Sequence, residues 1–286
     1  MLVKNNIELY INEKIEVAKN LPVDIIVSVC ELVWVAYVEG KTIYACGNGG
    51  NAGFVANLIN DLANHPFVSE DKHNALPENI PRLRAVDLTQ SGAAITGITN
   101  DISFDHIFSQ QMINDKISEG DIVFGFSGSG NSGNVLQAFN TAKNFNAHTV
   151  SITRGNGGKS RELADYCILI PGTSTFPGQT GGNDNNFHFE DALSYIAHMI
   201  TGIMCKKIKE EYGRVSVLVN NAGITKDNII MRMTENDWND VINTNLTGYF
   251  NMCKAVIKQT IKQRDGRIIN ISSIVGLRGN IGQTNY

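Results

Sequence analysis

The residues from Phe126 to Gly133 join an apolar run to an amphipathic one through a loop of small polar residues. Residues 121–126 are apolar enough for a buried strand, and residues 134–143 have the spacing of a helix. This serine loop (residues 126–133) combines three glycines with the polar side chains of Ser127, Ser129, Asn131 and Ser132. Glycines let backbone N–H groups approach a phosphate, hydroxyls donate to its oxygens, and a helix N-terminus adds partial positive charge. The loop contains no lysine, which separates it from nucleoside-triphosphate P-loops. It therefore predicts a small phosphorylated ligand held by neutral donors.

Strands and helices alternate on both sides of this loop. The predicted strands are short apolar runs at 41–46, 84–88, 121–127, 148–153 and 166–171. The predicted helices are 3–19, 22–39, a segment ending near 64, 91–98, 103–115, 134–143, 158–164 and 187–211. This order predicts an α/β fold with a doubly wound parallel sheet covered on both faces. Ligands bind such sheets at the carboxyl ends of the strands.

A second glycine-rich loop follows the first predicted strand. This asparagine loop (residues 47–51) adds Asn48, Gly49 and Asn51 to the candidate phosphate contacts. An asparagine in a glycine turn also commonly serves only to satisfy the backbone, and serines in such loops commonly serve in caps and turns. Three hydroxyls among three glycines after a buried strand favour phosphate binding in the serine loop.

Composition excludes several classes of function. The net charge of −4 offers no basic footprint for nucleic acid. The five cysteines are scattered without a CxxC pair, as expected for free thiols in a reducing compartment. The N-terminus is too polar for a signal peptide, and no apolar run is long enough to span a membrane. We therefore expect a cytoplasmic protein without a nucleic-acid or membrane partner.

A different pattern begins near Lys207. Two apolar runs, 215–219 and 267–272, predict strands. Between them, Thr234 predicts a helix N-cap with Asp237 as its capping-box partner. Two strands and one or two helices form a poor independent core, so we expect their apolar faces to be exposed and the segment to be loosely packed.

Residues 1–206 resemble the sugar isomerase (SIS) domain family, and most closely its phosphoheptose (sedoheptulose 7-phosphate) isomerase branch. The matching motifs are Gly47–Ala52, Ala85–Thr89, Thr99–Asp101, Ser127–Ser132 and Phe189–His198. The resemblance implies a doubly wound sheet, a homotetramer, an active site built where subunits meet, and an aldose–ketose isomerase of a phosphorylated sugar. Some SIS domains sense phosphorylated sugars without catalysis, which is the first alternative.

This sequence departs from the family pattern at two places. Asn51 replaces a usual serine, and Asn57 replaces a usual histidine that lies four residues before an acidic residue, here Asp61. In phosphoheptose isomerases the positions of Asn57, Asp61, Glu190 and His198 bind zinc and include the acid and the base. The resemblance therefore leaves Asp61, Glu190 and His198 as a reduced ligand set for zinc or another divalent metal.

An isomerase also needs a base and a group that handles oxygen protons. We expect Glu190 and His198 to form this acid–base pair, with Asp61 as a third candidate. Glu190 and His198 are eight residues apart, which places them about 80° apart around an ideal helix. The plainer alternatives are a helix-terminal carboxylate for Glu190 and a histidine bonded to the backbone for His198.

Residues 207–286 resemble the short-chain dehydrogenase/reductase family, and specifically 3-oxoacyl-acyl-carrier-protein reductase. The motifs are Leu218–Thr225, Asn243–Leu246, Gly266–Ser273 and Gly282–Tyr286. By position, Asn245, Ser273 and Tyr286 match the catalytic asparagine, serine and tyrosine. The family's lysine, four residues after the tyrosine, and its glycine-rich cofactor loop are absent from this sequence. We therefore expect an incomplete, vestigial site without NADPH binding or reductase activity. The alternative is the remnant of a bifunctional protein.

Overall fold

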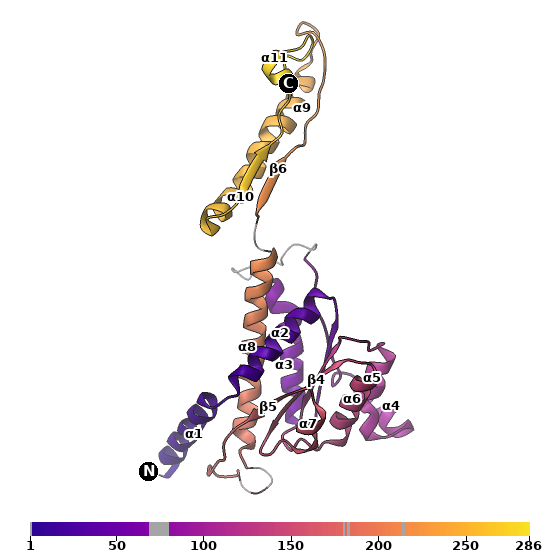
Figure 1. The fold of residues 1–286 in the computed structure, drawn as a ribbon, viewed down its shortest axis with the longest axis vertical. Coiled ribbons are helices and arrows are strands. Elements are labelled where there is room, and N and C mark those ends of the chain that lie inside the picture. Colours follow the sequence, from indigo (N-terminus) through magenta and orange to yellow (C-terminus); the bar gives the residue numbers. More distant parts are fainter. Residues whose placement is uncertain (1, 69–79, 180, 182–183, 213–214) are drawn as a thin grey trace. The chain divides into compact units, whose positions relative to one another are not determined.

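The computed structural model describes residues 2–68, 80–179, 181, 184–212 and 215–286. The chain divides into two compact units, Met1–Ile208 and Lys209–Tyr286. Each unit contains a sheet of its own, with five strands in the first and two in the second. Figure 1 shows both units.

The sheet of the first unit is entirely parallel, which confirms the predicted α/β fold. Its strands are β1 (Thr42–Gly47), β2 (Arg84–Asp87), β3 (Ile122–Phe126), β4 (His148–Arg154) and β5 (Tyr166–Ile170). They lie in the order β2-β1-β3-β4-β5. The chain moves outward from β1 to β2 and then returns to the other side of β1, so the switch point of the sheet lies between β1 and β3.

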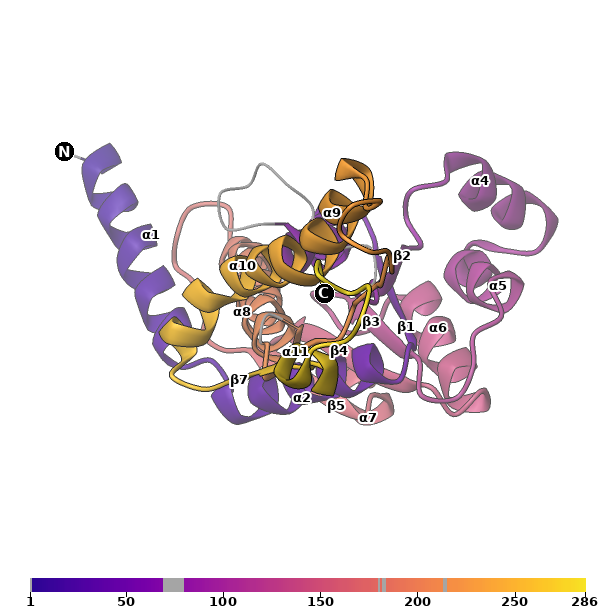
Figure 2. The ribbon, with the colours of Figure 1, turned by 90° about the horizontal axis from the view of Figure 1, so that it is seen from above.

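Helices cover both faces of this sheet (Figures 1 and 2). One face packs on α2 (Val23–Val38), α3 (Gly50–Asn64) and α8 (Asn186–Tyr212). The other packs on α4 (Gly92–Asp101), α5 (Ile107–Asn114) and α6 (Gly133–Asn144). Alternate residues of one strand serve the two cores: Ile43 lies in the first and Tyr44 in the second. The apolar runs of the sequence are therefore strands buried on both faces.

The remaining helices of this unit are α1 (Leu2–Lys19) and α7 (Gly158–Leu163), with short 3₁₀ turns at His65–Phe67 and Phe104–His106. No single described helix is both long and apolar enough to cross a membrane, although α1 and α2 meet the length and composition requirement together across a 65° bend.

The second unit has a parallel pair of strands, β6 (Val217–Asn220) and β7 (Arg267–Asn270). Helices α9 (Glu235–Ile242) and α10 (Gly248–Gln263) are joined by a π-helical turn, Asn243–Thr247, and α11 (Ile274–Arg278) follows β7. Neither the π-helical turn nor α11 was predicted from the sequence.

Two expectations for the second unit are confirmed. Thr234 and Asp237 form the predicted capping box at the start of α9. Apolar strand residues are also exposed, since Val217, Val219 and Ile269 keep 53%, 51% and 46% of their surface accessible. The described residues of this unit are too few to cover both faces of its sheet.

Candidate active site

The asparagine loop and the serine loop begin at neighbouring positions of the first unit's sheet. Gly47, the last residue of β1, is in register with Phe126, the last residue of β3. A Cβ atom on Gly47 would lie 2.9 Å from the Cβ of Asn51 and 3.1 Å from that of Phe126, so the junction requires glycine. The two loops therefore open together at the switch point, where ligands bind sheets of this kind.

A pair of amides joins the two loops. Asn48 Nδ2 donates to Asn134 Oδ1 at 2.9 Å, and Asn134 Nδ2 donates to Asn48 Oδ1 at 2.8 Å. Asn134 Oδ1 also accepts the N–H of Val135 at 3.0 Å, which ties the pair to the first turn of α6. The Asn48 amide, predicted as a phosphate contact, is thus directed at Asn134.

Ser127 and Ser132 bring two hydroxyls together in the serine loop. Their Oγ atoms are 3.0 Å apart, and Ser127 is 2% exposed. Ser132 occupies the N-cap of α6, but its hydroxyl makes no capping hydrogen bond. Both hydroxyls therefore lie at the positive end of a twelve-residue helix, where they can donate to phosphate oxygens.

Ser129 and Asn131, also predicted as phosphate contacts, make local hydrogen bonds. Ser129 Oγ accepts the N–H of Asn131 at 3.2 Å, and Asn131 Nδ2 donates to the Ser129 carbonyl at 2.9 Å. Asn131 Oδ1 accepts the N–H of Lys159, at the start of α7, at 3.1 Å. These contacts are the turn chemistry that serine and asparagine favour in glycine-rich loops.

Gly49 and Asn51 shape the start of α3. Gly49 has a φ of 57°, in the left-handed region that favours glycine. The N–H of Asn51 donates to the Asn48 carbonyl at 3.1 Å. Asn51 Oδ1 is buried and has no hydrogen-bond partner among the described residues. A buried acceptor of this kind is normally satisfied by a donor, so it offers a place for a ligand hydroxyl.

Glu190, on the first turns of α8, lies beside the asparagine loop. A Cβ atom on Gly50 would be 3.3 Å from Glu190 Oε1, and Asn186 Nδ2 donates to the same oxygen at 3.0 Å. Asn186 Oδ1 is in turn 3.4 Å from a Cβ placed on Gly128. Asn186, which holds the carboxylate, therefore also lies beside Gly128 of the serine loop.

An arginine that the sequence analysis did not select also lies at the serine loop. A Cβ atom on Gly128 would be 3.3 Å from Arg154 Nε, at the carboxyl end of β4. Sequence inspection missed Arg154 because only the neighbouring positions of β3 and β4 in the sheet bring it to Gly128. The signal in the sequence that could have identified it is an arginine at the end of a predicted strand, at the edge of the sheet where ligands bind.

Asp61 and His198 form a separate pair. His198 Nε2 lies 3.7 Å from Asp61 Oδ2, and His65 Nδ1 lies 3.7 Å from Asp61 Oδ1. Asp61 is buried, whereas the His198 side chain is 62% exposed. His198 lies eight residues after Glu190 on α8, a rise of about 12 Å along a helix. The acid–base pair predicted from the sequence is therefore not assembled within one chain.

The predicted metal ligands do not converge. Among the residues that the structure describes, no group of three His, Cys, Asp or Glu side chains can hold a metal ion. Glu190 lies against Gly50, while Asp61 and His198 lie together farther along their helices. As arranged in one chain, these residues do not fit a zinc or other divalent metal site.

His198 borders an apolar groove formed by α1, α2 and α8. The groove contains exposed apolar side chains, among them Val27 at 54%, Ile203 at 40% and Met199 at 38%. The buried Ile26 and Cys30 also line it. An exposed apolar surface of this kind on α2 and α8 is typical of a protein–protein contact.

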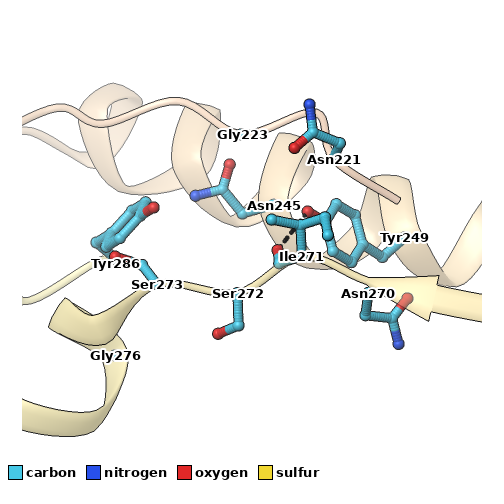
Figure 3. A pocket seen from close by; sticks show the side chains of 10 residues that line it. All are labelled: Asn221, Gly223, Asn245, Tyr249, Asn270, Ile271, Ser272, Ser273, Gly276 and Tyr286. Atoms are coloured by element: carbon cyan, nitrogen blue, oxygen red, sulfur yellow. Dashed lines mark hydrogen bonds between the residues drawn. The ribbon is translucent and has the colours of Figure 1, made fainter. Parts of the chain in front are cut away.

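The three reductase-like residues line one pocket of the second unit (Figure 3). The side-chain amide of Asn245 makes two hydrogen bonds to the backbone of Ile224. Its Oδ1 accepts the Ile224 N–H and its Nδ2 donates to the Ile224 carbonyl, each at 2.9 Å. Ser273 Oγ accepts the N–H of Val275 at 3.2 Å, and Tyr249 donates to the Ile271 carbonyl at 3.0 Å. Of the described residues that line this pocket, none is cationic.

Comparisons with known proteins match the two units separately. A family model described as SIS domain matches residues 10–154, and one described as short chain dehydrogenase matches residues 200–286. The 3-oxoacyl-[acyl-carrier-protein] reductase FabG of Vibrio harveyi is 58% identical over 81 residues, which are 28% of this chain and 33% of that protein. The chain thus spans about a third of the length of this curated relative.

Solved structures resemble the first unit. The phosphoheptose isomerase GmhA from Neisseria gonorrhoeae has a TM-score of 0.57 and 25% identity, covering 73% of this chain and 99% of that one. A phosphoheptose isomerase from Francisella tularensis has a TM-score of 0.58 and 23% identity, covering 71% and 96%. Together with the family matches, these similarities confirm both resemblances inferred from the motifs.

Proposed function

The chain belongs to the SIS domain family, and from this premise we propose that it interconverts the aldose and ketose forms of a phosphorylated sugar, most like sedoheptulose 7-phosphate. The observation that carries the proposal is the Glu190 carboxylate, which lies beside Gly50 and accepts from Asn186, a neighbour of the serine loop. Likeness to the phosphoheptose isomerase GmhA, at 25% identity, supports the substrate class.

In the proposed reaction the serine loop holds the phosphate and thereby positions the sugar chain. Starting from the aldose, Glu190 removes the proton from C2, the electrons of that C–H bond form the C1–C2 double bond, and those of the C1 carbonyl shift to its oxygen to give an enediolate. Glu190 returns the proton to C1, while the hydroxyl proton on O2 passes to O1 as the C2 carbonyl forms. No atom is gained or lost, and the reverse sequence converts the ketose. Asn51 Oδ1 is the acceptor we assign to a sugar hydroxyl, because it is buried without a described partner.

We assign the transfer of the hydroxyl proton to His198, whose imidazole is paired with the Asp61 carboxylate. Because His198 lies about 12 Å along α8 from Glu190, we propose that it serves the site of a neighbouring copy. The exposed apolar groove beside His198 supports a homo-oligomer, for which the family resemblance implies a tetramer. A protein–protein contact there would bring the exposed imidazole against another chain.

The mechanism assigns no step to a metal. The proposed ligands Asp61, Glu190 and His198 do not converge within the described chain, and Asn57 stands where the family carries a histidine. Proton transfer by Glu190, with the imidazole of His198 on the hydroxyl, supplies the acid–base chemistry through the chain's own residues.

The separation of Glu190 from His198 favours one rival, a module that senses a phosphorylated sugar without converting it. NMR of purified protein with sedoheptulose 7-phosphate separates the two. Isomerisation requires appearance of the aldose signals, whereas sensing requires binding with an unchanged sugar spectrum.

The matched variants are E190Q and D191N, which neutralise adjacent carboxylates. We expect E190Q to abolish turnover while calorimetry still detects sugar binding, and D191N to retain turnover, since Asp191 bonds Tyr10 and Lys14 instead. Near-normal turnover by E190Q would contradict the assignment of Glu190 as the base.

For the second unit we propose no reductase activity. Asn245 is engaged with Ile224, and no described lining residue of the pocket is cationic, although the resemblance calls for a lysine to hold the cofactor ribose. The test is NADPH fluorescence and its oxidation in the presence of a 3-oxoacyl thioester. An enhanced fluorescence or a measurable oxidation rate would contradict this proposal.

A further inference from the structure

We propose that Arg154 completes the phosphate site of the serine loop and is the residue that selects a fully charged phosphate ester. The inference rests on the proposed function and adds a residue to it. It also replaces the expectation, drawn from the sequence, that only neutral donors hold the ligand.

The position of Arg154 is fixed by the backbone. Its N–H donates to the Gly128 carbonyl at 3.3 Å, and the hydroxyl of Thr153 donates to the same oxygen at 3.3 Å. The end of β4 is therefore bonded directly to the second residue after β3. The side chain of Arg154 also lies beside Gly128, since its Nε is 3.3 Å from a Cβ placed on that glycine.

The side chain is anchored at its far end as well. Arg154 Nη1 donates to the carbonyl of Asp184, in the segment that leads into α8. Burial lowers the pKa of the guanidinium, and the nearby Asp184 carboxylate opposes this shift. The group stays charged nonetheless, because an arginine loses its proton only far above neutral pH. A fixed cation thus lies beside Gly128 of the serine loop, which also carries two hydroxyls at the positive end of α6.

Glycine at position 128 is what allows this approach. A Cβ atom there would lie 3.3 Å from Arg154 Nε and 3.4 Å from both Asn186 Oδ1 and Phe189 Cε1. The distance to Arg154 Nε is tighter than an ordinary side-chain contact, so a side chain at position 128 would require the guanidinium to shift by a few tenths of an ångström. The absence of a side chain at position 128 therefore leaves room for the planar guanidinium of Arg154.

Guanidinium groups recognise phosphate by paired, charge-assisted hydrogen bonds. Neutral hydroxyls and backbone N–H groups bind one or two negative charges with little discrimination, whereas a partly buried cation favours the more charged ligand. The chemistry points to a phosphate monoester, such as the terminal phosphate of a sugar, rather than to an uncharged sugar.

The test measures dissociation constants for inorganic phosphate and for sedoheptulose 7-phosphate by calorimetry. R154Q should raise both by about tenfold or more, since a hydrogen bond to a charged group is lost. R154K should fall between the wild type and R154Q. R161Q is the matched control, because Arg161 is an exposed arginine on α7 and should leave both constants unchanged.

A steady-state readout separates binding from general damage. In R154Q we expect KM for the sugar to rise more than kcat falls, because the residue holds the phosphate and lies apart from the reacting carbons. If R154Q does not fold, G128A keeps the arginine but displaces it, and should raise the same constants.

The two proposals fail differently. Wild-type protein that binds neither probe would overturn the proposed function together with this inference. Wild-type protein that binds both probes, with unchanged constants in a folded R154Q or G128A variant, would overturn the role of Arg154 alone.

Discussion

Asn48 and Asn134 exchange two side-chain hydrogen bonds across the switch point of the sheet, at 2.9 and 2.8 Å. The pair joins the asparagine loop to the first turn of α6, so both halves of the candidate site share one fixed geometry. Asn134 is 1% exposed, and loss of its amide would leave Asn48 without this partner.

We therefore expect N134A to lower the free energy of unfolding by about 1–3 kcal/mol and to weaken binding of inorganic phosphate. Urea denaturation and calorimetry measure the two effects. N140A, an exposed asparagine on the same helix, is the control and should change neither. A stable N134A variant with wild-type phosphate affinity would show that the pair does not position the loops.

The amino-acid pattern predicted most of the first unit because its signals are local. The strand at 122–126 is a run of apolar residues, and the helix at 133–144 has the apolar spacing of a helix face. The burial of both strand faces follows from the absence of polar alternation. The same kind of local signal predicted the capping box of Thr234 and Asp237.

The site was harder to predict because its contacts join distant segments. Nothing local distinguishes an asparagine that binds phosphate from Asn48, a loop residue whose partner Asn134 lies on α6. Arg154 reaches Gly128 only because β3 and β4 are neighbours. Glu190 and His198 share a helix in the sequence, yet their partners, Gly50 and Asp61, lie at opposite ends of α3.

Glu13 provides a prediction about pH. Its carboxylate accepts from Ser174 Oγ at 2.6 Å and from Thr175 N at 2.9 Å, and it lies 3.0 Å from His188 Nε2. Burial alone would raise the pKa of Glu13, but these hydrogen bonds outweigh it and lower the pKa to about 2 from the ordinary 4.5. The hydrogen bonds from Ser174 and Thr175 connect α1 to the segment before α8.

Because the folded-state pKa of Glu13 lies below the unfolded one, its contribution is complete above about pH 4.5 and is lost as the pH falls toward 2. We expect E13Q to cost about 1–2 kcal/mol at pH 7, allowing for solvent screening, and the difference from the wild type to shrink at pH 4 and below. Urea denaturation between pH 7 and pH 3.5 measures this. E16Q is the control: its exposed carboxylate accepts from Lys19 Nζ, one turn along α1, at 2.9 Å, and it should show a small difference at every pH.

The apolar groove beside His198 provides a prediction about assembly. Val27 lines the groove and is 54% exposed, whereas Val38, on the same helix, is 60% exposed and does not line it. We expect V27E to reduce the mass of the particle in light scattering and to lower sugar turnover, because a charge would be buried in the contact. V38E should keep the wild-type mass and rate. A wild-type mass for V27E would place the contact elsewhere.

The separation of Glu190 from His198 along α8 leads to the sharpest prediction for the shared site. If one copy supplies Glu190 and its neighbour supplies His198, E190Q and H198A homo-oligomers are each inactive, but a mixed oligomer contains some sites with both groups intact. After equal amounts of the two variants are dissociated and reassembled, the simplest two-copy arrangement predicts roughly a quarter of the wild-type rate. NMR of sedoheptulose 7-phosphate conversion measures the recovery, and each variant reassembled with itself is the control. Absence of recovery in oligomers shown by mass spectrometry to be mixed would mean that both groups act within one chain, and that α8 or α3 must move to bring them together.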